Sequence, residues 1–330
     1  MGRLGKVLVT GAGGFIGSSL VEALLRRGHP VRAFVRYNSG GRRGWLDDVE
    51  PDEPERLETF FGDVTDARAV QEAMAGCDRV FHLAALIGIP YSYVAPASYV
   101  AVNVTGTLNV LEAARAHRVE RVIVTSTSEV YGTARYTPID EEHPLQAQSP
   151  YAASKVGADH LALSYHRAFG LPVVVVRPFN TYGPRQSMRA VIPTIIVQAL
   201  FADAVHIGSR DPVRDMVCVE DTAAGFVALA DSPACVGQVA NLATGAGVTV
   251  GELIERILGL VGRRLPVVES AERKRPETSE VYKLLGSADL ARQRTGWEAR
   301  TSLDDGLART VAWFRERVDA RQVRPGEYHV

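Results

Sequence analysis

The sequence lacks an excess of charge of either sign. Its 330 residues carry 37 lysines and arginines against 38 acidic residues, which gives a formal net charge of −1. The basic residues are scattered along the chain, whereas a protein that binds nucleic acid needs a basic face. We therefore exclude nucleic acid as the main partner. An anionic ligand would have to be held by a local group of donors, because the protein as a whole supplies no attractive field.

Cysteine is scarce, and long hydrophobic runs are missing. The three cysteines, Cys77, Cys218 and Cys235, show no CxxC spacing and are interpreted as buried or incidental thiols in a reducing compartment. No apolar run approaches the roughly 20 residues of a membrane span, and the opening MGRLGKVLVTGAGG lacks the apolar core of a signal peptide. No group of His, Cys, Asp or Glu has the spacing of a metal site. We expect a cytoplasmic protein with no membrane partner and no bound metal.

The first half of the chain does have a regular alternation of short apolar segments with longer helical patterns. The apolar segments are rich in β-branched residues and apolar on both faces, as buried parallel strands are. We expect strands at 6–10, 31–35, 57–61, 79–84, 121–126 and 172–178. We expect helices at 16–28, 66–76, 104–117 and 151–170. The alternation predicts an α/β fold of the Rossmann type, a doubly wound parallel sheet with right-handed crossovers.

After residue 178 the pattern changes to longer loops, recurrent proline and glycine, and helical patterns such as 190–202 without regular strands between them. The segment 225–245 is expected to rejoin the sheet. A smaller, discontinuous and mostly helical substrate-binding domain would lie over the carboxyl edge of the sheet, where open α/β sheets bind ligands. The predicted division gives 1–178 plus about 215–245 to the dinucleotide-binding domain, and 179–214 plus about 246–330 to the substrate-binding domain.

Three glycines, Gly11, Gly14 and Gly17, lie between the first expected strand and the first expected helix. Glycines at such a junction permit a tight turn and a close approach of the backbone, and the helix N-terminus then faces a pyrophosphate. A lone glycine triplet is a weak signal, but this one stands at the first strand–helix junction of an alternating pattern. It predicts a dinucleotide-binding loop, and the alternative is a plain glycine-rich turn.

The end of the second expected strand bears on the identity of the dinucleotide. An acidic residue usually stands there and holds the ribose 2′-hydroxyl of NAD, whereas this strand ends with Val35 and Arg36. An arginine suits a 2′-phosphate, so the sequence favours NADP over NAD; the alternative is an exposed Arg36 that stacks on adenine. Asp63 is interpreted as an adenine contact, or as the cap of a helix that begins near Asp66. The polar stretch 38–56 is interpreted as a mobile surface loop.

Tyr151 and Lys155 stand four residues apart at the start of a helical pattern, so they share one face of the helix. A lysine ammonium beside a phenol favours the phenolate, which would let Tyr151 act as a base well below its usual pKa of about 10. The spacing alone is common. The pair follows a dinucleotide loop and a strand end rich in hydroxyls, and this order predicts that Tyr151 and Lys155 are catalytic. The alternative is a tyrosine–lysine pair on a helix surface.

The stretch VTSTSEVYG, residues 124–132, places a carboxylate two residues after Thr127. Alternation along an extended strand would point Thr125, Thr127 and Glu129 to one side. Thr127 is then the hydroxyl that positions the substrate oxygen for Tyr151, and Glu129 is a candidate general base beside the reacting carbon. The alternative is that Glu129 caps a loop or forms a salt bridge in it.

Seven motifs run through the chain: TGAGGFIG, HLAAL, NVTGTLNVLEAA, TSTSEVYG, SPYAASK, RPFNTYGPRQ and RDMVCVEDTA. Together they resemble the extended short-chain dehydrogenase/reductases that act on nucleotide sugars, over essentially the whole chain. The resemblance implies an NAD or NADP cofactor, tightly bound and recycled. The cofactor contacts that it implies are Gly11, Gly14, Phe15, Ile16, Gly17, Arg36, Asp63, Val64, Leu83, Ala84, Ala85, Asn103, Tyr151, Lys155 and Pro178.

The residues after the catalytic hydroxyl narrow the reaction that the resemblance implies. C4-epimerases generally lack an acid there, glucose-type 4,6-dehydratases resemble Thr-Asp-Glu, and mannose-type dehydratases resemble the Thr127-Ser128-Glu129 of this chain. UDP-glucuronate decarboxylases also show Ser-Glu, but their tyrosine motif differs from YAASK. The resemblance therefore implies a nucleotide-sugar 4,6-dehydratase, most similar to N-acetylglucosamine-type enzymes. A C4-epimerase, a UDP-glucuronate decarboxylase and, remotely, a non-catalytic NADP-sensing module are the alternatives.

The implied reaction has no net redox change. Tyr151 takes the C4 hydroxyl proton as hydride leaves C4, Glu129 removes the C5 proton, and water leaves C6 before the hydride returns there. In the glucose-type enzymes an aspartic acid protonates the C6 hydroxyl, whereas the poor donor Ser128 stands in that place here. We expect Glu129 to carry the proton from C5 to the leaving hydroxyl itself, with a water-assisted route as the alternative.

The resemblance also implies how the substrate is held and how the chain assembles. The donors that it implies for a nucleotide diphosphate are Asn180, Arg185, Arg214 and Arg275. The alternative for each arginine is a surface ion pair, above all for Arg214 beside Asp215. A homodimer is implied in which helices around 97–117 and 151–169 pack as a four-helix bundle. His82 is interpreted as a packed or hydrogen-bonded histidine instead of a catalyst.

Overall fold

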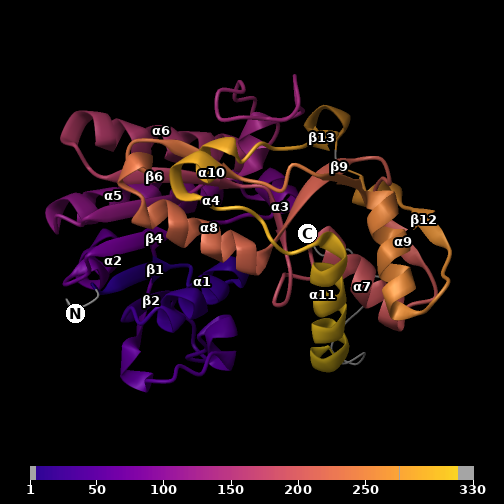
Figure 1. The fold of residues 1–330 in the computed structure, drawn as a ribbon, viewed down its shortest axis with the longest axis horizontal. Helices are drawn as coiled ribbons and strands as arrows, with labels where there is room; N and C mark the ends of the chain where they lie inside the picture. The colour runs from indigo at the N-terminus through magenta and orange to yellow at the C-terminus, as the bar shows by residue number, and fades with distance from the viewer. Residues whose placement is uncertain (1–4, 275, 319–330) are drawn as a thin grey trace.

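The computed structural model describes residues 5–274 and 276–318. A seven-stranded sheet, in which every pairing is parallel, forms its centre in the order β10-β6-β5-β4-β1-β2-β3 (Figure 1). The strands are β1 (Val7–Thr10), β2 (Val31–Arg36), β3 (Leu57–Gly62), β4 (Arg79–His82), β5 (Arg121–Thr125), β6 (Val173–Pro178) and β10 (Val239–Leu242). The six strands expected in the first half are confirmed, and β10 confirms the expected return of 225–245 to the sheet.

Helices cover both faces of this sheet (Figure 1). One face carries α1 (Phe15–Arg26) and α8 (Val219–Asp231), which pack against each other. The other face carries α2 (Ala67–Met74), α5 (Gly106–Ala116) and α6 (Pro150–Phe169). Strands β1 and β6 are buried along their whole length because their alternating side chains enter an apolar layer on each side. The predicted α/β fold with a doubly wound parallel sheet is confirmed.

Residues after β6 add a smaller unit beyond the carboxyl ends of the central strands (Figure 1). Its strands are β7 (Asn180–Tyr182), β8 (Val205–Ile207), β9 (Val213–Cys218), β11 (Gly247–Thr249), β12 (Val267–Glu269) and β13 (Lys283–Leu284). Its helices include α7 (Val191–Phe201), α9 (Val250–Val261) and α11 (Leu303–Arg317), while α10 (Asp289–Thr295) packs on α8.

The expectation that this region lacks regular strands between its helices is wrong. Strands β7, β8, β11 and β12 have three residues each, which is too short for a period of two to be visible in the sequence. The small sheet nevertheless organises a separate apolar core that includes Ile195, Ile254 and Phe314. The division of the chain into two domains at the predicted boundaries stays a prediction.

The segment 38–56 is partly built into the fold, contrary to the expectation of a mobile surface loop. It contains two short 3₁₀ helices, η1 (Gly44–Asp48) and η2 (Pro54–Arg56). Leu46 is fully buried, and Val49 is 5% exposed. Isolated apolar residues in a polar stretch give no periodicity, so the sequence pattern did not reveal that this segment is anchored.

Contacts from η1 join the glycine loop to the last described helix. The Trp45 backbone N–H donates to the Gly13 carbonyl at 3.0 Å. The Trp45 ring packs edge-on against Trp313 of α11, with 5.3 Å between the ring centroids. Arg317, at the end of the same helix, pairs with Asp48 at 2.9 Å. The last described helix therefore packs against η1 beside the glycine loop.

Local signals fix the start and the end of α6. The Ser149 hydroxyl accepts the Ala152 N–H at 3.1 Å, and Pro150 occupies the first turn, where its missing N–H costs nothing. Gly170 ends the helix with φ of 68°. A hydroxyl cap of this kind contributes about 1 kcal/mol. These signals place Tyr151 in the first turn, beside the carboxyl end of β5.

The sequence also gave expectations about cysteines, membrane spans and metal sites. Cys77, Cys218 and Cys235 are free and buried, as expected. No described helix is long and apolar enough to cross a membrane. The described residues bring no three His, Cys, Asp or Glu side chains into a group that could hold a metal ion.

Candidate active site

The loop between β1 and α1 has the shape of a pyrophosphate site. Gly11 has φ of 70°, and the Gly14 N–H donates to the Gly11 carbonyl at 3.0 Å. A Cβ at Gly17 would lie 2.1 Å from the Gly11 oxygen, so the turn requires glycine at this position. Helix α1 then begins without a side-chain cap, which leaves backbone N–H groups at its positive end for an anion.

The loop after β4 lies against the glycine loop. The Leu83 N–H donates to the Thr10 carbonyl, and the Ala84 N–H donates to Thr10 Oγ1, each at 3.2 Å. A Cβ at Gly11 would lie 2.7 Å from the Ala84 nitrogen, so the two loops touch through backbone atoms. Other predicted cofactor contacts lie at the same edge of the sheet: Phe15 and Ile16 open α1, Val64 follows β3, Ala85 follows Ala84, and Pro178 ends β6.

His82 is a structural histidine, as the sequence analysis proposed. It is 2% exposed, its Nδ1 lies 2.8 Å from Thr10 Oγ1, and its Nε2 lies 3.0 Å from Thr107 Oγ1. Burial, helped by the positive charge of Lys155, lowers the pKa of His82 to about 3. The neutral imidazole therefore joins β1, β4 and α5 beneath the two loops.

We expect His82 to make the fold sensitive to acid. The pKa of His82 falls from 6.5 to about 3 on folding, so the unfolded chain takes up a proton that the native state excludes. This contribution is present above pH 6.5 and is lost as the pH falls toward about 3. Between about pH 7 and about pH 5, the free energy of unfolding should fall by about 2 kcal/mol through this group. Urea unfolding of wild type and His82→Gln at both pH values should show that difference; parallel losses in the two proteins would contradict it.

Arg36 and Asp63 stand at the carboxyl ends of β2 and β3. The Arg36 side chain is 82% exposed, and its Nε lies 3.9 Å from the Asp63 carboxylate. Asp63 accepts the Thr65 N–H at 2.9 Å and the Thr65 hydroxyl at 2.8 Å. The cap of α2 is Asp66, which accepts the Arg68 and Ala69 N–H groups, so the alternative of Asp63 as that cap is wrong. Both side chains stay candidates for contact with an adenosine ribose.

Tyr151 lies with Thr127 at the end of β5. Tyr151 is 7% exposed, and the ring of Tyr99 stands 6.2 Å from its ring in an edge-on contact. Burial raises the pKa of Tyr151 well above its usual range, a hydrogen bond from Thr127 lowers it, and the charge of Glu129 raises it again. The described surroundings therefore favour the protonated phenol, whereas the sequence analysis expected the phenolate.

Lys155 is directed to the backbone of β5. It is 3% exposed, and its Nζ donates to the Thr125 carbonyl oxygen at 2.5 Å. Burial lowers the pKa of Lys155 to about 8, although Asp159 acts in the opposite direction. Helical spacing predicted correctly that Tyr151 and Lys155 share a face, but it could not show that the ammonium turns to a carbonyl.

Asn103 connects the loop after β4 to α6. It lies in a π-helical turn, η3 (Val100–Thr105), and is 1% exposed. Its Oδ1 accepts the Leu86 N–H at 2.8 Å, and its Nδ2 donates to Leu86 O and Ser154 Oγ at 2.9 Å each. Ser154 in turn donates to the Tyr151 carbonyl. The predicted cofactor contact Asn103 is thus held where it can fix the start of α6 relative to the cofactor-side loop.

Glu129 reaches the site by a different backbone path from the one expected. β5 ends at Thr125, and residues Ser128–Tyr131 form a 3₁₀ helix, η4, so the predicted alternation along an extended strand is wrong. The Thr127 hydroxyl starts this turn by accepting the Glu129 N–H at 3.2 Å. Glu129 is 9% exposed, its charge acts on Tyr151, and Ser128 is 2% exposed. Glu129 is therefore largely withdrawn from solvent, at a place from which its charge acts on the tyrosine.

Two of the expected diphosphate donors lie in the small sheet. Asn180 pairs with Met216 between β7 and β9, and its Oδ1 is buried with no hydrogen-bond partner in the described part of the chain. Arg214 on β9 is 7% exposed and lies 3.4 Å from a carboxylate oxygen of Glu280. The expected Arg275 lies outside the described residues.

Asp215, with which Arg214 could form an ion pair, makes its hydrogen bonds to other residues. Asp215 accepts the Thr244 N–H and hydroxyl and the Gly245 and Gly286 N–H groups. The carboxylate that follows Arg214 in the chain therefore fastens two loops of the smaller unit.

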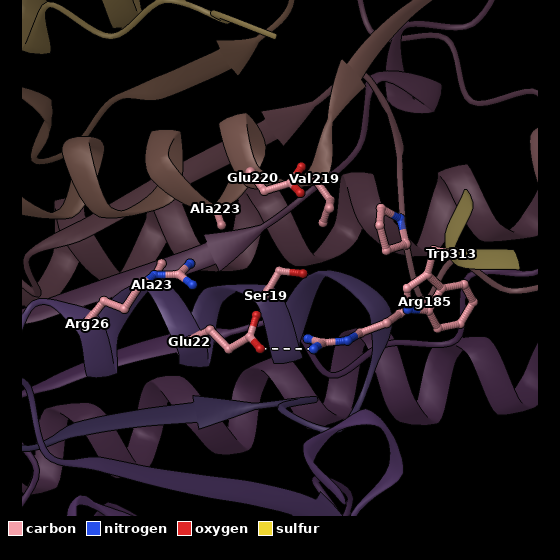
Figure 2. A pocket seen from close by; sticks show the side chains of 10 residues that line it. Ser19, Glu22, Ala23, Arg26, Arg185, Val219, Glu220, Ala223 and Trp313 are labelled. Carbon is pink, nitrogen blue, oxygen red and sulfur yellow. Dashed lines mark hydrogen bonds and ion pairs between the residues drawn. The ribbon is translucent and has the colours of Figure 1, made fainter. Parts of the chain in front are cut away.

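Arg185 turns toward α1, as Figure 2 shows. Its Nη2 lies 2.9 Å from Glu22, its Nη1 lies 3.4 Å from Ser18 Oγ, and its φ is 70°. It lines a cavity beside α1 and α8, together with Glu220 and Trp313. The ion pair that the sequence left open as the alternative is thus present, and a role of Arg185 in holding substrate stays a prediction.

Comparison with known proteins identifies the family of this chain. The sequence model described as "GDP-mannose 4,6 dehydratase" matches residues 8–310. The chain belongs to this family. A dTDP-glucose 4,6-dehydratase from Actinoplanes sp. is 36% identical over 320 residues, which cover 94% of this chain and 98% of that protein. A UDP-glucose 4-epimerase from Mycolicibacterium smegmatis is 35% identical over 318 residues, which cover 94% and 99%.

Solved structures of similar proteins share the fold of this GDP-mannose 4,6-dehydratase family member. The dTDP-glucose 4,6-dehydratase from Streptomyces venezuelae with NAD bound has a TM-score of 0.86 and 31% identity, over 94% of this chain and 97% of that one. The UDP-glucose 4-epimerase from Thermus thermophilus in complex with NAD has a TM-score of 0.85 and 30% identity, over 95% and 100%. The predicted membership of the extended short-chain dehydrogenase/reductases, and the prediction of an enzyme, are confirmed.

The site of this family member contains a buried network that sequence reasoning missed. Ser126, which precedes Thr127, is joined by hydrogen bonds to Asp159 and, through it, to Arg177. One signal was present, because Asp159 follows Lys155 by four residues in a helical pattern and so had to share its face. The strand position of Arg177 could not be matched to it without the fold.

Proposed function

We propose that the protein is a nucleotide-sugar 4,6-dehydratase, which converts an NDP-hexose or NDP-N-acetylhexosamine to the 4-keto-6-deoxy sugar. The proposal rests above all on Glu129, a buried carboxylate whose charge reaches Tyr151 from the turn that Thr127 begins. A base at this place can take the proton from C5 while the C4 oxygen is held at Tyr151. A C4-epimerase has no need for that base, which is why the dehydratase reaction is favoured.

Thr127, Tyr151 and Lys155 are assigned to the first proton transfer. Thr127 orients the C4 hydroxyl, and Tyr151 takes its proton. Because burial raises the pKa of Tyr151, a positive charge must lie close by for the phenol to become a base. Lys155, whose pKa is lowered to about 8, still carries most of its charge near neutral pH. A nicotinamide bound at the glycine loop would accept the C4 hydride and return it to C6.

Glu129 is assigned to the elimination. It takes the C5 proton and delivers it to the C6 hydroxyl, which leaves as water while the C5–C6 double bond forms. After hydride adds to C6, a proton returns to C5, so the product differs from the substrate by one water. Ser128 is a poor proton donor and is more deeply buried than Glu129, which favours transfer by the carboxylate itself.

One assay separates the candidate reactions. Purified protein is incubated in turn with UDP-, GDP- and dTDP-sugars, and the products are analysed by mass. Loss of one water supports the dehydratase, loss of carbon dioxide identifies a decarboxylase, and unchanged mass with altered retention identifies an epimerase. Turnover of none of them, despite tight cofactor binding, would favour the non-catalytic sensing module and overturn the proposal.

The substrate diphosphate is assigned to Asn180 and Arg214, with Arg275 as a further candidate. Asn180 offers an amide in β7 whose Oδ1 is buried, and Arg214 offers a nearly buried guanidinium in β9. Arg214 stands two residues before Met216, the register partner of Asn180. Guanidinium forks suit phosphate oxygens because they supply paired N–H donors.

We propose NADP as the preferred cofactor, because Arg36 presents a guanidinium at the end of β2 where an acid would hold the ribose of NAD. Calorimetry should show tighter binding of NADP than of NAD to the wild-type protein. Arg36→Ala should weaken NADP binding about tenfold or more and leave NAD binding nearly unchanged, since the lost contact is charge-assisted. Equal or tighter binding of NAD to the wild type would contradict the preference.

We propose a homodimer formed by η3, α5 and α6. The side chains of Ala101, Ala153 and His160 are exposed along these helices, and Val100 is 55% exposed. Light scattering should give twice the chain mass of 35.7 kDa, and Val100→Glu should shift the protein toward the monomer. A wild-type monomer would contradict the assembly. The cytoplasmic location expected from the sequence stays a prediction.

A further inference from the structure

Asp159 is a buried carboxylate that the proposed reaction does not yet use. It lies one helical turn after Lys155 on α6 and is 1% exposed. Three donors converge on its Oδ2: Ser126 Oγ at 2.8 Å, Arg177 Nε at 3.1 Å and Arg177 Nη2 at 3.0 Å. Its Oδ1 is buried and accepts no hydrogen bond from the described residues. Oδ2 is thus held by three hydrogen bonds, whereas Oδ1 acts on its surroundings through charge.

The Asp159 carboxyl stays ionised in this setting. Burial raises the pKa of Asp159, and the opposing effects of Arg177, Ser126 and Lys155 do not cancel that rise. The Arg177 guanidinium does not lose its proton at any accessible pH, and two of its N–H groups point at one carboxylate oxygen. A neutral acid would leave that buried cation without a counter-charge, which is strongly unfavourable. The charged form therefore prevails near neutral pH.

Lys155 needs such a carboxylate. Its ammonium is 3% exposed and donates to the Thr125 carbonyl. A neutral carbonyl satisfies one donor but does not offset the cost of burying a full positive charge. Among the groups that act on Lys155, Asp159 favours the charged form.

Other titratable and charged groups also surround Lys155. The groups that act on Lys155, or on its neighbours Tyr151 and Asp159, are His82, Tyr99, Glu129 and Arg177. His82 is neutral, because its pKa is lowered to about 3, and Tyr151 is a neutral phenol. The charge of Glu129 acts on Tyr151, and Arg177 is compensated by Asp159 itself.

We propose that Asp159 is a positioning residue of the catalytic pair, whose carboxylate keeps Lys155 charged and, through Ser126 and Arg177, fixes α6 to the ends of β5 and β6. Ser126 stands between Thr125, which accepts the lysine, and Thr127, which faces Tyr151. A single carboxylate thus controls both the charge and the spacing of the pair. The inference rests on the proposed role of Lys155 in the dehydratase reaction, but the charge of Lys155 can be measured without turnover.

The scarcity of lysine makes this measurement direct. The chain has four lysines, at positions 6, 155, 274 and 283. With ¹³C at lysine Cε, a pH titration by NMR follows four signals, and Lys155→Met identifies the signal of Lys155. In wild type this signal should titrate near pH 8. In Asp159→Asn it should titrate about 1–2 pH units lower, because the counter-charge is gone.

Arg177→Met is the matched control, because it breaks the same buried pair but keeps the carboxylate. It should destabilise the fold without lowering the titration of Lys155. If Asp159→Asn does not fold, Asp159→Asn with Arg177→Met removes both charges and should still lower the titration. An unshifted Lys155 in the Asp159 variants, or an equal drop in Arg177→Met, would overturn the inference.

The pH dependence of kcat/KM links this charge to the reaction. Its alkaline limb should move to lower pH in Asp159→Asn by the same interval as the NMR titration, and Asp159→Glu should restore part of it. If wild type turns over no nucleotide sugar, the proposed function fails while the titration still decides the role of Asp159. If turnover is normal but Lys155 does not shift in the variants, the role of Asp159 fails alone.

Discussion

Glu129→Gln should lose water elimination by at least about 10²-fold, and up to about 10⁴-fold, with the substrate that wild type dehydrates. The amide keeps the size of the side chain but can neither take the C5 proton nor return it to the C6 hydroxyl. Thr127, Tyr151 and Lys155 remain in place, so oxidation at C4 should persist. Addition of the sugar nucleotide should therefore produce reduced nicotinamide, seen by its absorbance, without a product that has lost water.

Ser128→Ala is the control for this experiment. If Glu129 carries the proton itself, removal of the Ser128 hydroxyl should change the rate of water loss by only a few-fold. Wild-type elimination in Glu129→Gln would contradict the role of the carboxylate. Strong loss in Ser128→Ala, with Glu129 intact, would instead identify the serine as part of the proton path.

Tyr151→Phe should abolish both the oxidation and the elimination, with a loss of about 10³- to 10⁴-fold in kcat. The phenol is the group that takes the C4 proton, so no reduced nicotinamide should form, in contrast to Glu129→Gln. The buried ring is retained, and the contact with Tyr99 should preserve the fold. Stopped-flow absorbance and product mass would measure the two steps separately.

Tyr99→Phe provides the comparison for that variant. Its hydroxyl donates to the Gly88 carbonyl at 2.5 Å, so its loss should loosen the start of α3 (Ile89–Val94) without removing a reacting group. A decrease of a few-fold is expected. Reduced nicotinamide that forms in Tyr151→Phe at the wild-type rate would show that another group takes the C4 proton.

Patterns that repeat over several residues made the fold predictable. Most strands of the central sheet were found because they are apolar and alternate with helices of clear period. The three-residue strands of the smaller unit carry no such period. Their pairing joins β7, β9 and β11, which are distant in sequence: Asn180 pairs with Met216, and Arg214 pairs with Val248.

The same distinction applies to the residues of the candidate site. The glycine loop and the Tyr151–Lys155 pair follow from local spacing, and the structure gives them the expected positions. The place of Glu129 depended on where β5 stops, and a hydroxyl cap at Thr127 ended the strand earlier than alternation assumed. Burial, which spacing does not report, also reversed the expected effect on the Tyr151 pKa.

The contact of η1 with α11 has a consequence for how the chain matures. Arg317 and Asp48 are 269 positions apart, and Trp45 meets Trp313 over a similar interval. During synthesis on a ribosome, the glycine loop emerges long before α11, the helix that η1 joins to it. The glycine loop is therefore synthesised well before the contact between η1 and α11 can form. A nascent chain halted before α11 would display the glycine motif and the central strands while this contact was still missing.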